Sequence, residues 1–188
     1  DLYQRTASGA GIAELLFESG FNKYSSDWSR DGKYLVYNAN DPKTKSDIWI
    51  LPMKGGRKPF LFLQTAFNEL GATFSPDGRW IAYESNESGR LEVYIRPFPG
   101  PGGKLQISTT GGSRPRWRRD GKELFYLARD FKVMAAEVKL GSAIVDLGSD
   151  RPLFQIHAFG GGGRDIYDVT GDGQRFLVAS PGSEESSS

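Results

Sequence analysis

One phrase recurs four times along the 188-residue chain, and it constrains the fold more than any other feature of the sequence. Each copy holds an Asp-Gly pair that is followed by an apolar stretch. The four pairs begin at Asp31, Asp77, Asp120 and Asp172, so they stand 46, 43 and 52 residues apart. Self-similarity at such a regular spacing is the signature of a repeat architecture. The chain is therefore expected to consist of similar structural units stacked on one another.

Each repeat is expected to contain two β-hairpins. The Asp-Gly pair predicts the first turn, because Gly accepts a positive φ and Asp hydrogen-bonds its own backbone. The alternating stretch after it, with Leu35 and Tyr37 in the first copy, predicts a strand. Outgoing strands of the second hairpins are expected over residues 47–51, 91–96 and 133–138, and short fourth strands over residues 59–62, 104–108 and 152–155. Four antiparallel strands in about 45 residues are typical of a β-propeller blade.

The sequence therefore predicts an all-β protein, a β-propeller of four-stranded antiparallel blades in a single domain over residues 1–180. The expected parts are an outer half-blade over 1–20, full blades over 21–63, 67–108 and 110–155, an inner half-blade over 164–180, and a flexible tail over 181–188. The two half-blades would form one composite blade, which gives a four-blade ring closed by both termini and a monomer. The alternative is a fragment of a larger propeller with about six to eight blades.

Composition narrows the classes of partner. Lys and Arg number 24 and Asp and Glu 23, so the net charge of +1 gives no field that would attract nucleic acid, and none is expected as a partner. The chain has no Cys, which excludes disulfides and thiolate metal sites. No apolar run approaches the length of a membrane span, so no membrane insertion is expected.

Aromatic residues precede three of the turns at the same repeat position. They are Trp28, Phe74 and Trp117, and their shared position predicts that they pack between blades. Four arginines flank the last of them: Arg114, Arg116, Arg118 and Arg119. Such a basic and aromatic cluster can bind nucleic acid. The favoured interpretation is a solvated turn with local ion pairs, because neighbouring side chains of a strand point to opposite faces.

The phrase over residues 74–83 resembles the Asp-Gly repeat of the TolB-like, or WD-like, β-propeller family, and the resemblance covers residues 21–180. A finer resemblance over residues 111–126 and 166–178 is to the C-terminal propellers of bacterial Ser/Thr kinase-type multidomain proteins. It implies a sensor or scaffold module of a larger bacterial protein, with a lean toward the periplasm or another extracytoplasmic face. The chain itself carries no kinase motif.

The expected function is that of a non-catalytic module that binds a protein, a peptide or a small ligand at the mouth of the central channel. The family resemblance implies that such partners meet residues just ahead of each innermost strand. Counting back eight or six residues from each repeat's Asp reaches positions whose side chains differ between blades. Varied polar residues on a repeated scaffold are where specificity is expected, although solvated loops would look the same. The predicted binding residues are Lys23, Glu69, Arg114 and Arg164.

No convergent catalytic set is visible, so the chain is expected not to be an enzyme and to need no cofactor or metal. The only histidine, His157, has no evident partner. One alternative is a propeller hydrolase or lyase that uses channel-mouth carboxylates such as Glu69 and Asp165. Another is an accessory propeller of a prolyl-oligopeptidase-like peptidase, since this repeat type also precedes that hydrolase domain. The chain has no Gly-x-Ser-x-Gly motif of its own.

Overall fold

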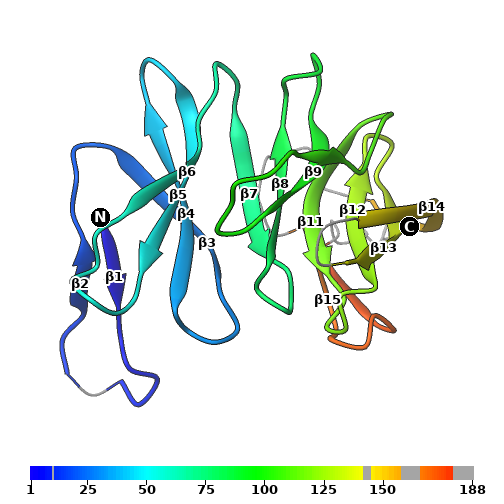
Figure 1. Ribbon diagram of the computed structural model, residues 1–188. Coiled ribbons are helices and arrows are strands. Elements are labelled where there is room, and N and C mark those ends of the chain that lie inside the picture. Colours follow the sequence, from blue (N-terminus) through cyan, green and yellow to red (C-terminus); the bar gives the residue numbers. More distant parts are fainter. Residues whose placement is uncertain (10, 142–144, 158–165, 180–188) are drawn as a thin grey trace, which may run out of the picture.

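The computed structural model describes residues 1–9, 11–141, 145–157 and 166–179 (Figure 1). These residues form β-strands and no helix, and therefore include no apolar helix long enough to cross a membrane. The strands make three four-stranded antiparallel sheets and two two-stranded sheets. The prediction of an all-β fold with four-stranded antiparallel blades is confirmed.

The three four-stranded sheets are the blades, and in each of them neighbouring strands follow one another along the chain. The first blade consists of β3 (Asn22–Trp28), β4 (Tyr34–Asp41), β5 (Lys45–Pro52) and β6 (Phe60–Leu63). The second consists of β7 (Glu69–Phe74), β8 (Trp80–Ser85), β9 (Glu92–Pro97) and β10 (Leu105–Gln106). The third consists of β11 (Gly112–Trp117), β12 (Glu123–Ala128), β13 (Lys132–Leu140) and β14 (Val145–Gln155).

Two shorter sheets flank the blades. The N-terminal pair consists of β1 (Leu2–Gln4) and β2 (Glu14–Phe17), and the C-terminal pair of β15 (Tyr167–Val169) and β16 (Phe176–Val178). In Figure 1 the blades stand in a row, with the N-terminal pair at the left end and β15 toward the right end. The division of the chain into a single domain over residues 1–180 stays a prediction.

The Asp-Gly pairs form the predicted turns between the first two strands of each repeat. In the first turn the Ser29 hydroxyl donates to Asp31 Oδ1 at 2.8 Å, and the Lys33 amide donates to the same oxygen at 3.1 Å. Gly32 has a φ of 69°, which a residue with a side chain rarely adopts. The Lys33 side chain and amide, together with Ser29, lower the pKa of Asp31 to about 2.

In the third turn a different residue lowers the pKa of the turn aspartate. Arg118 stands where the first two turns have Ser, and its Nε and Nη2 donate to the two carboxylate oxygens of Asp120 at 2.8 and 2.7 Å. This guanidinium lowers the pKa of Asp120 to about 2. The ion pair between Arg118 and Asp120 agrees with the predicted solvated turn.

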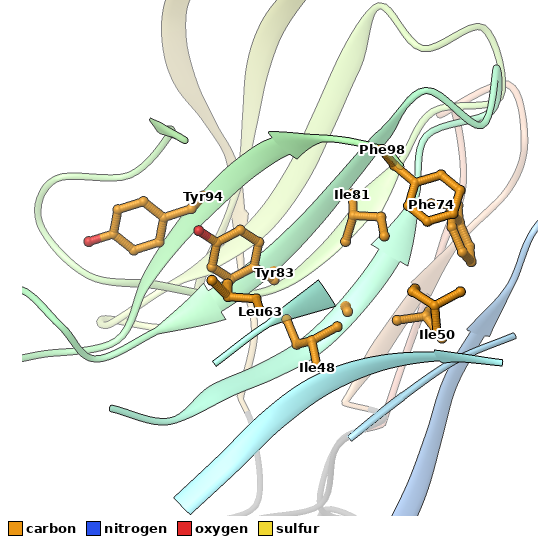
Figure 2. Packing of buried hydrophobic residues seen from close by; sticks show 10 residues of the cluster. Ile48, Ile50, Leu63, Phe74, Ile81, Tyr83, Tyr94 and Phe98 are labelled. Carbon is orange, nitrogen blue, oxygen red and sulfur yellow. The ribbon is translucent and has the colours of Figure 1, made fainter. Parts of the chain in front are cut away.

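Apolar side chains on both faces of each blade build the cores between blades. Val36, Ile48 and Ile50 of the first blade pack against Phe74 and Ile81 of the second, and all of these are at most 5% exposed. Figure 2 shows this core, with Phe98 beside Phe74. A second core joins the second and third blades in the same way. Neither face of a blade could stay in water, so stacking is what makes each sheet stable.

Phe98 is a central side chain of the first of these cores. It follows β9, is 8% exposed, and its ring lies 5.1 Å from that of Tyr34 and 5.2 Å from that of Phe74. Edge-to-face rings at this distance attract each other beyond the burial of their area. Phe98 therefore holds the second blade against the first.

The expected composite blade is not formed, which corrects the prediction of a closed four-blade ring. Within the described strands, the N-terminal and C-terminal pairs belong to separate sheets. Leu2 and Leu16 of the N-terminal pair pack on the first blade, whereas Tyr167 and Phe176 of the C-terminal pair pack on the third. Each short pair covers the apolar face of the full blade next to it in the chain. These two blades are the first and the third, so the two pairs lie at opposite ends of the row (Figure 1).

The aromatic position before each turn is also not uniform. Phe74 is 5% exposed and Trp117 is partly buried between blades, as predicted. Trp28 is 44% exposed, so the prediction that it packs between blades is wrong. The physical reason is that Trp28 lies on the innermost strand of the first blade, and no innermost strand of a preceding blade covers it.

Replacing Phe98 with alanine is expected to destabilise the protein by about 3–5 kcal/mol, because it leaves a cavity between two blades. Chemical denaturation followed by tryptophan fluorescence measures the change. Leu61→Ala in β6 is the control, since Leu61 is 42% exposed and should cost far less. Equal losses for the two variants would show that the blades are not held together through this core.

The lowered pKa values of the turn aspartates predict how the stability of the protein changes at low pH. The pKa of Asp120 is lowered from 3.8 to about 2 on folding, so its contribution is present above pH 4 and is lost as the pH falls toward 2. Asp120→Asn is expected to reduce the difference in melting temperature between pH 5 and pH 2.5. Asp41→Asn, at a hairpin tip outside the repeat turns, is the control. An unchanged difference in the Asp120 variant would contradict the assignment.

Candidate functional site

The structure places the predicted binding residues at separate points, and three of them lie in its described part. Lys23 Nζ donates to the carbonyl oxygens of Phe21 at 2.9 Å and Ser19 at 3.0 Å, and it lies 3.3 Å from Asp1 Oδ1. The Lys23 side chain is completely buried. Its ammonium group therefore ties the start of the chain to the first blade. A role of Lys23 in binding stays a prediction, and it would require these contacts to be given up.

Glu69 is also buried, at the start of β7. Its Oε1 accepts a hydrogen bond from the Thr65 hydroxyl at 2.5 Å, and its Oε2 has no hydrogen-bond partner. Burial raises the pKa of Glu69 above its ordinary value, with a smaller contribution from the charge of Asp47. The side chain is 0% exposed, so a substrate cannot reach it without a rearrangement.

Arg114 lies in β11 at a strained point of the backbone. Its φ is 55°, its amide donates to Glu84 Oε1 at 2.8 Å, and its carbonyl oxygen accepts from the Tyr167 hydroxyl at 2.7 Å. These bonds fix the main chain where the third blade meets its neighbours on both sides. Arg164 and Asp165 lie outside the described residues.

The four innermost strands instead share one cavity of about 620 Å³. Strands β3, β7, β11 and β15 each contribute to its wall, and β16 completes it. The lining residues are Ser26, Asp27, Thr73, Arg116, Ile166, Tyr167, Asp168, Leu177, Val178 and Ala179. This cavity, called the channel cavity below, is the candidate functional site.

One repeat position supplies four of the polar side chains of the channel cavity. Asp27, Thr73, Arg116 and Asp168 each stand four residues before the Asp of their own repeat. The sequence-based count stopped at eight and six residues and so missed them, although a count of four would have found them. The same position thus presents two carboxylates, a hydroxyl and a guanidinium to one space.

β-Bulges explain why the residues four positions before the Asp line the cavity, whereas most of those six or eight positions before it do not. The pairing register shifts between Ser25 and Asp27 in the first blade, and between Ser113 and Arg116 in the third. A bulge inserts an unpaired residue and turns the following side chains to a new direction. In these two blades simple alternation from the Asp therefore fails before the bulge, and the positions six and eight residues before the Asp do not line the cavity, whereas Ile166, six residues before Asp172, does.

Asp27 accepts three hydrogen bonds at the wall of the channel cavity. Its Oδ2 accepts from the Thr73 hydroxyl at 3.0 Å and from the Phe74 amide at 2.8 Å, and its Oδ1 accepts from the Trp28 amide at 2.7 Å. Burial raises the pKa of Asp27, while these three bonds and the charge of Arg116 oppose the rise. The carboxylate therefore links the innermost strands of the first two blades.

The part of the wall formed by β11, β15 and β16 combines charge with apolar surface. Arg116 Nε lies 3.9 Å from Asp168 Oδ1, and Asp168 is 72% exposed at its side chain. Ile166, Leu177 and Val178 add apolar surface beside this pair. The cavity can therefore donate and accept hydrogen bonds and also cover apolar groups. Within the described residues, no three His, Cys, Asp or Glu side chains gather where they could hold a metal ion.

Asp27→Asn is expected to lower the free energy of unfolding by about 1–3 kcal/mol, because an amide nitrogen would face a backbone N–H that needs an acceptor. Thr73→Val removes only one of the three donors and is expected to cost about 1 kcal/mol or less. Denaturant titration measures both changes. If the two variants were equally stable, Asp27 would not be the link between the blades.

The fold is that of known β-propellers. No family model matches the sequence, and no curated protein matches it. Among solved structures, TolB from Acinetobacter baumannii is 18% identical with a TM-score of 0.69, over 96% of this chain and 42% of that one. A structure assigned as TolB from Agrobacterium tumefaciens is 21% identical with a TM-score of 0.60, over 76% of this chain and 54% of that one. The chain thus spans about half the length of these structures.

The comparison also corrects the expectation that the chain is not an enzyme. The periplasmic gluconolactonase of Pseudomonas aeruginosa has a similar structure, with 15% identity and a TM-score of 0.51 over 80% of this chain and 47% of that one. The same architecture therefore carries an enzyme as well as TolB, and a missing triad in the sequence does not exclude catalysis. At these identities the likeness shows the fold alone. The finer resemblance to kinase-type propellers stays a prediction. What is shown is that this chain has a TolB-like β-propeller fold.

Proposed function

We propose that the protein binds an extended segment of a protein or peptide partner in the channel cavity. The observation that carries the proposal is that four successive innermost strands each direct a polar side chain from one repeat position into the same space, and that these side chains are of three different types. The positions that build the inter-blade cores are apolar in each repeat, for example Val36, Ala82 and Phe125, whereas the cavity position varies in charge and polarity.

The chemistry of the wall fits a peptide. An extended segment presents backbone donors and acceptors along its length, together with apolar side chains. Arg116, Asp168 and Thr73 can bind the polar groups, while Ile166 and Leu177 can cover an apolar side chain. A volume of about 620 Å³ lies within the usual range of ligand sites. The similarity to TolB at the level of fold is compatible with this proposal.

Location and parent protein belong to the same proposal. The family resemblance suggests a sensor or scaffold module at an extracytoplasmic face, and one of the similar structures is a periplasmic protein by its name. The alternative in which Glu69 and Asp165 act as channel-mouth carboxylates of a hydrolase or lyase finds no support at Glu69, because that side chain is buried.

Peptides selected from a random displayed library on the wild-type protein test the proposal. Arg116→Ala is expected to weaken their binding about tenfold, since a lost charge-assisted contact is worth about 1.4 kcal/mol. Arg30→Ala, at an exposed turn, is the control for the loss of one positive charge. Binding is measured by fluorescence anisotropy, and the fold of each variant by circular dichroism.

Two results would overturn this assignment. One is a set of peptides that bind wild type and the Arg116 variant with equal affinity. The other is equal weakening by the Arg116 and Arg30 variants, which would indicate a general charge effect rather than a contact in the channel cavity.

A further inference from the structure

Three buried side-chain oxygens of the described residues have no hydrogen-bond partner, and they come from two strands that pack on each other. They are Ser46 Oγ and Asp47 Oδ1 in β5 of the first blade and Glu69 Oε2 in β7 of the second. Asp47 is 1% exposed and Glu69 is 0% exposed. Nearly all buried polar groups in folded proteins are paired, so three unpaired oxygens at one blade junction require an explanation.

Asp47 and Glu69 lie close together, although they belong to different blades. The side-chain amide nitrogen of Asn38 in β4 donates to the carbonyl oxygen of Glu69 at 2.6 Å and to that of Asp47 at 3.4 Å. Burial is the main cause of the raised pKa of Glu69, and the charge of Asp47 adds to the rise. The two carboxylates are therefore within electrostatic reach of each other.

Neutral donors satisfy only the other oxygen of each carboxylate. Asp47 Oδ2 accepts from the Thr44 hydroxyl at 2.6 Å and from Gln64 Nε2 at 2.9 Å. Glu69 Oε1 accepts from the Thr65 hydroxyl at 2.5 Å. Among the described residues, no lysine or arginine forms an ion pair with Asp47 or Glu69. Burying two negative charges without a positive partner is strongly unfavourable.

The next blade junction shows how protein groups alone satisfy the same position. Glu92 in β9 corresponds to Asp47, since each pairs with the residue eight positions after the Asp of its repeat. The two carboxylate oxygens of Glu92 accept from the Ser108 hydroxyl at 2.5 Å and from the Gly111 amide at 2.9 Å. Arg90 Nε lies 3.3 Å from Glu92 Oε1 and supplies a positive charge. Glu92 therefore has a partner at each oxygen and a compensating cation.

This second junction also holds one acidic side chain where the first holds two. Gly112 stands eight residues before the Asp of its repeat, as Glu69 does. A Cβ atom on Gly112 would lie 2.3 Å from Ser108 Oγ. The hydroxyl that binds Glu92 therefore occupies the space that a side chain would need. The first junction differs by an additional carboxylate.

The lysine that corresponds to Arg90 in the first junction makes a different contact. Lys45 stands two residues before Asp47, as Arg90 stands two residues before Glu92. Its ammonium group lies over the ring of Phe67, 5.9 Å from the ring centre. The first junction thus combines two acidic side chains with no paired cation among the described residues.

We propose that Asp47 and Glu69 hold a calcium ion between the first two blades. The unpaired atoms are all oxygens, which are the ligands of hard cations, and two carboxylates balance a divalent charge. Calcium accepts about six to eight oxygens in a flexible geometry, whereas magnesium demands a near-ideal octahedron. Only two acidic side chains meet here, so the Ser46 hydroxyl and water would complete the shell. The expected binding is therefore weak, with a dissociation constant of about 10⁻⁴–10⁻³ M.

A water molecule or a shared proton would explain the unpaired oxygens differently. Water can donate to both carboxylates but leaves their charges uncompensated. A proton on Glu69 removes one charge and supplies one donor. A calcium ion balances both charges and binds several oxygens at once. The pair also lies close to the surface, because Gln64, which donates to Asp47, is exposed.

Thermal unfolding of the full chain tests the proposal after treatment with EDTA. Calcium chloride at about 10 mM, compared with sodium chloride of equal ionic strength, is expected to raise the melting temperature by about 3–10 °C. Glu69→Gln is expected to abolish the rise, because it removes a charged ligand and keeps an oxygen that can accept from Thr65. Glu87→Gln is the control and should keep the full rise, since Glu87 is a nearby carboxylate that already pairs with Lys104.

Calorimetric titration with calcium gives a second readout, and one ion per chain is expected for the wild type. Asp47→Asn is measured in parallel, and circular dichroism shows which variants are folded. A wild-type protein that neither binds calcium nor melts higher with it would overturn the proposal in favour of a proton or water. Binding that persists in a folded Glu69→Gln or Asp47→Asn variant would overturn it too, because the ion would then lie elsewhere.

Discussion

Each blade of this protein has two apolar faces, and everything else in the structure depends on covering both. In β4, Val36 packs toward the second blade while Leu35 and Tyr37 pack toward the N-terminal pair. Because successive side chains of a strand point to opposite faces, a strand with apolar side chains on both faces needs a neighbour on each side. Stacking is therefore obligatory, and a blade without a neighbour leaves large side chains in water.

This constraint also builds the channel cavity. Stacking blades in register brings their innermost strands together, so one residue from each repeat faces the same space. The core positions must stay apolar to keep the stack, whereas the cavity positions are free to differ, as Asp27, Thr73 and Arg116 do. The hydrogen bonds from Thr73 and Phe74 of the second blade to Asp27 of the first show that a cavity residue can also hold neighbouring blades together. One innermost strand thus carries both contacts that hold the blades together and residues that we propose to bind a partner.

The sequence predicted the blades well because their signals are local. An Asp-Gly pair specifies its own turn, and the bonds that Ser29 and Lys33 make to Asp31 span only a few residues. The channel residues were missed because bulges near Asp27 and Arg116 shift the alternation that a count relies on. Their shared distance of four residues from the repeat's Asp was visible in the sequence, but nothing there showed which distance faces the channel.

The sequence by itself determined the repeat, the turns and the apolar faces, since each follows from the conformational preferences of a few neighbouring residues. Only the tertiary structure decided which faces meet. It left Trp28 and Leu177 exposed and kept the two short pairs in separate sheets, although their sequences match positions that are buried elsewhere. It also buried Lys23 and Glu69 among structural partners. These outcomes depend on the angle between packed blades, which is set by contacts between residues far apart in the chain.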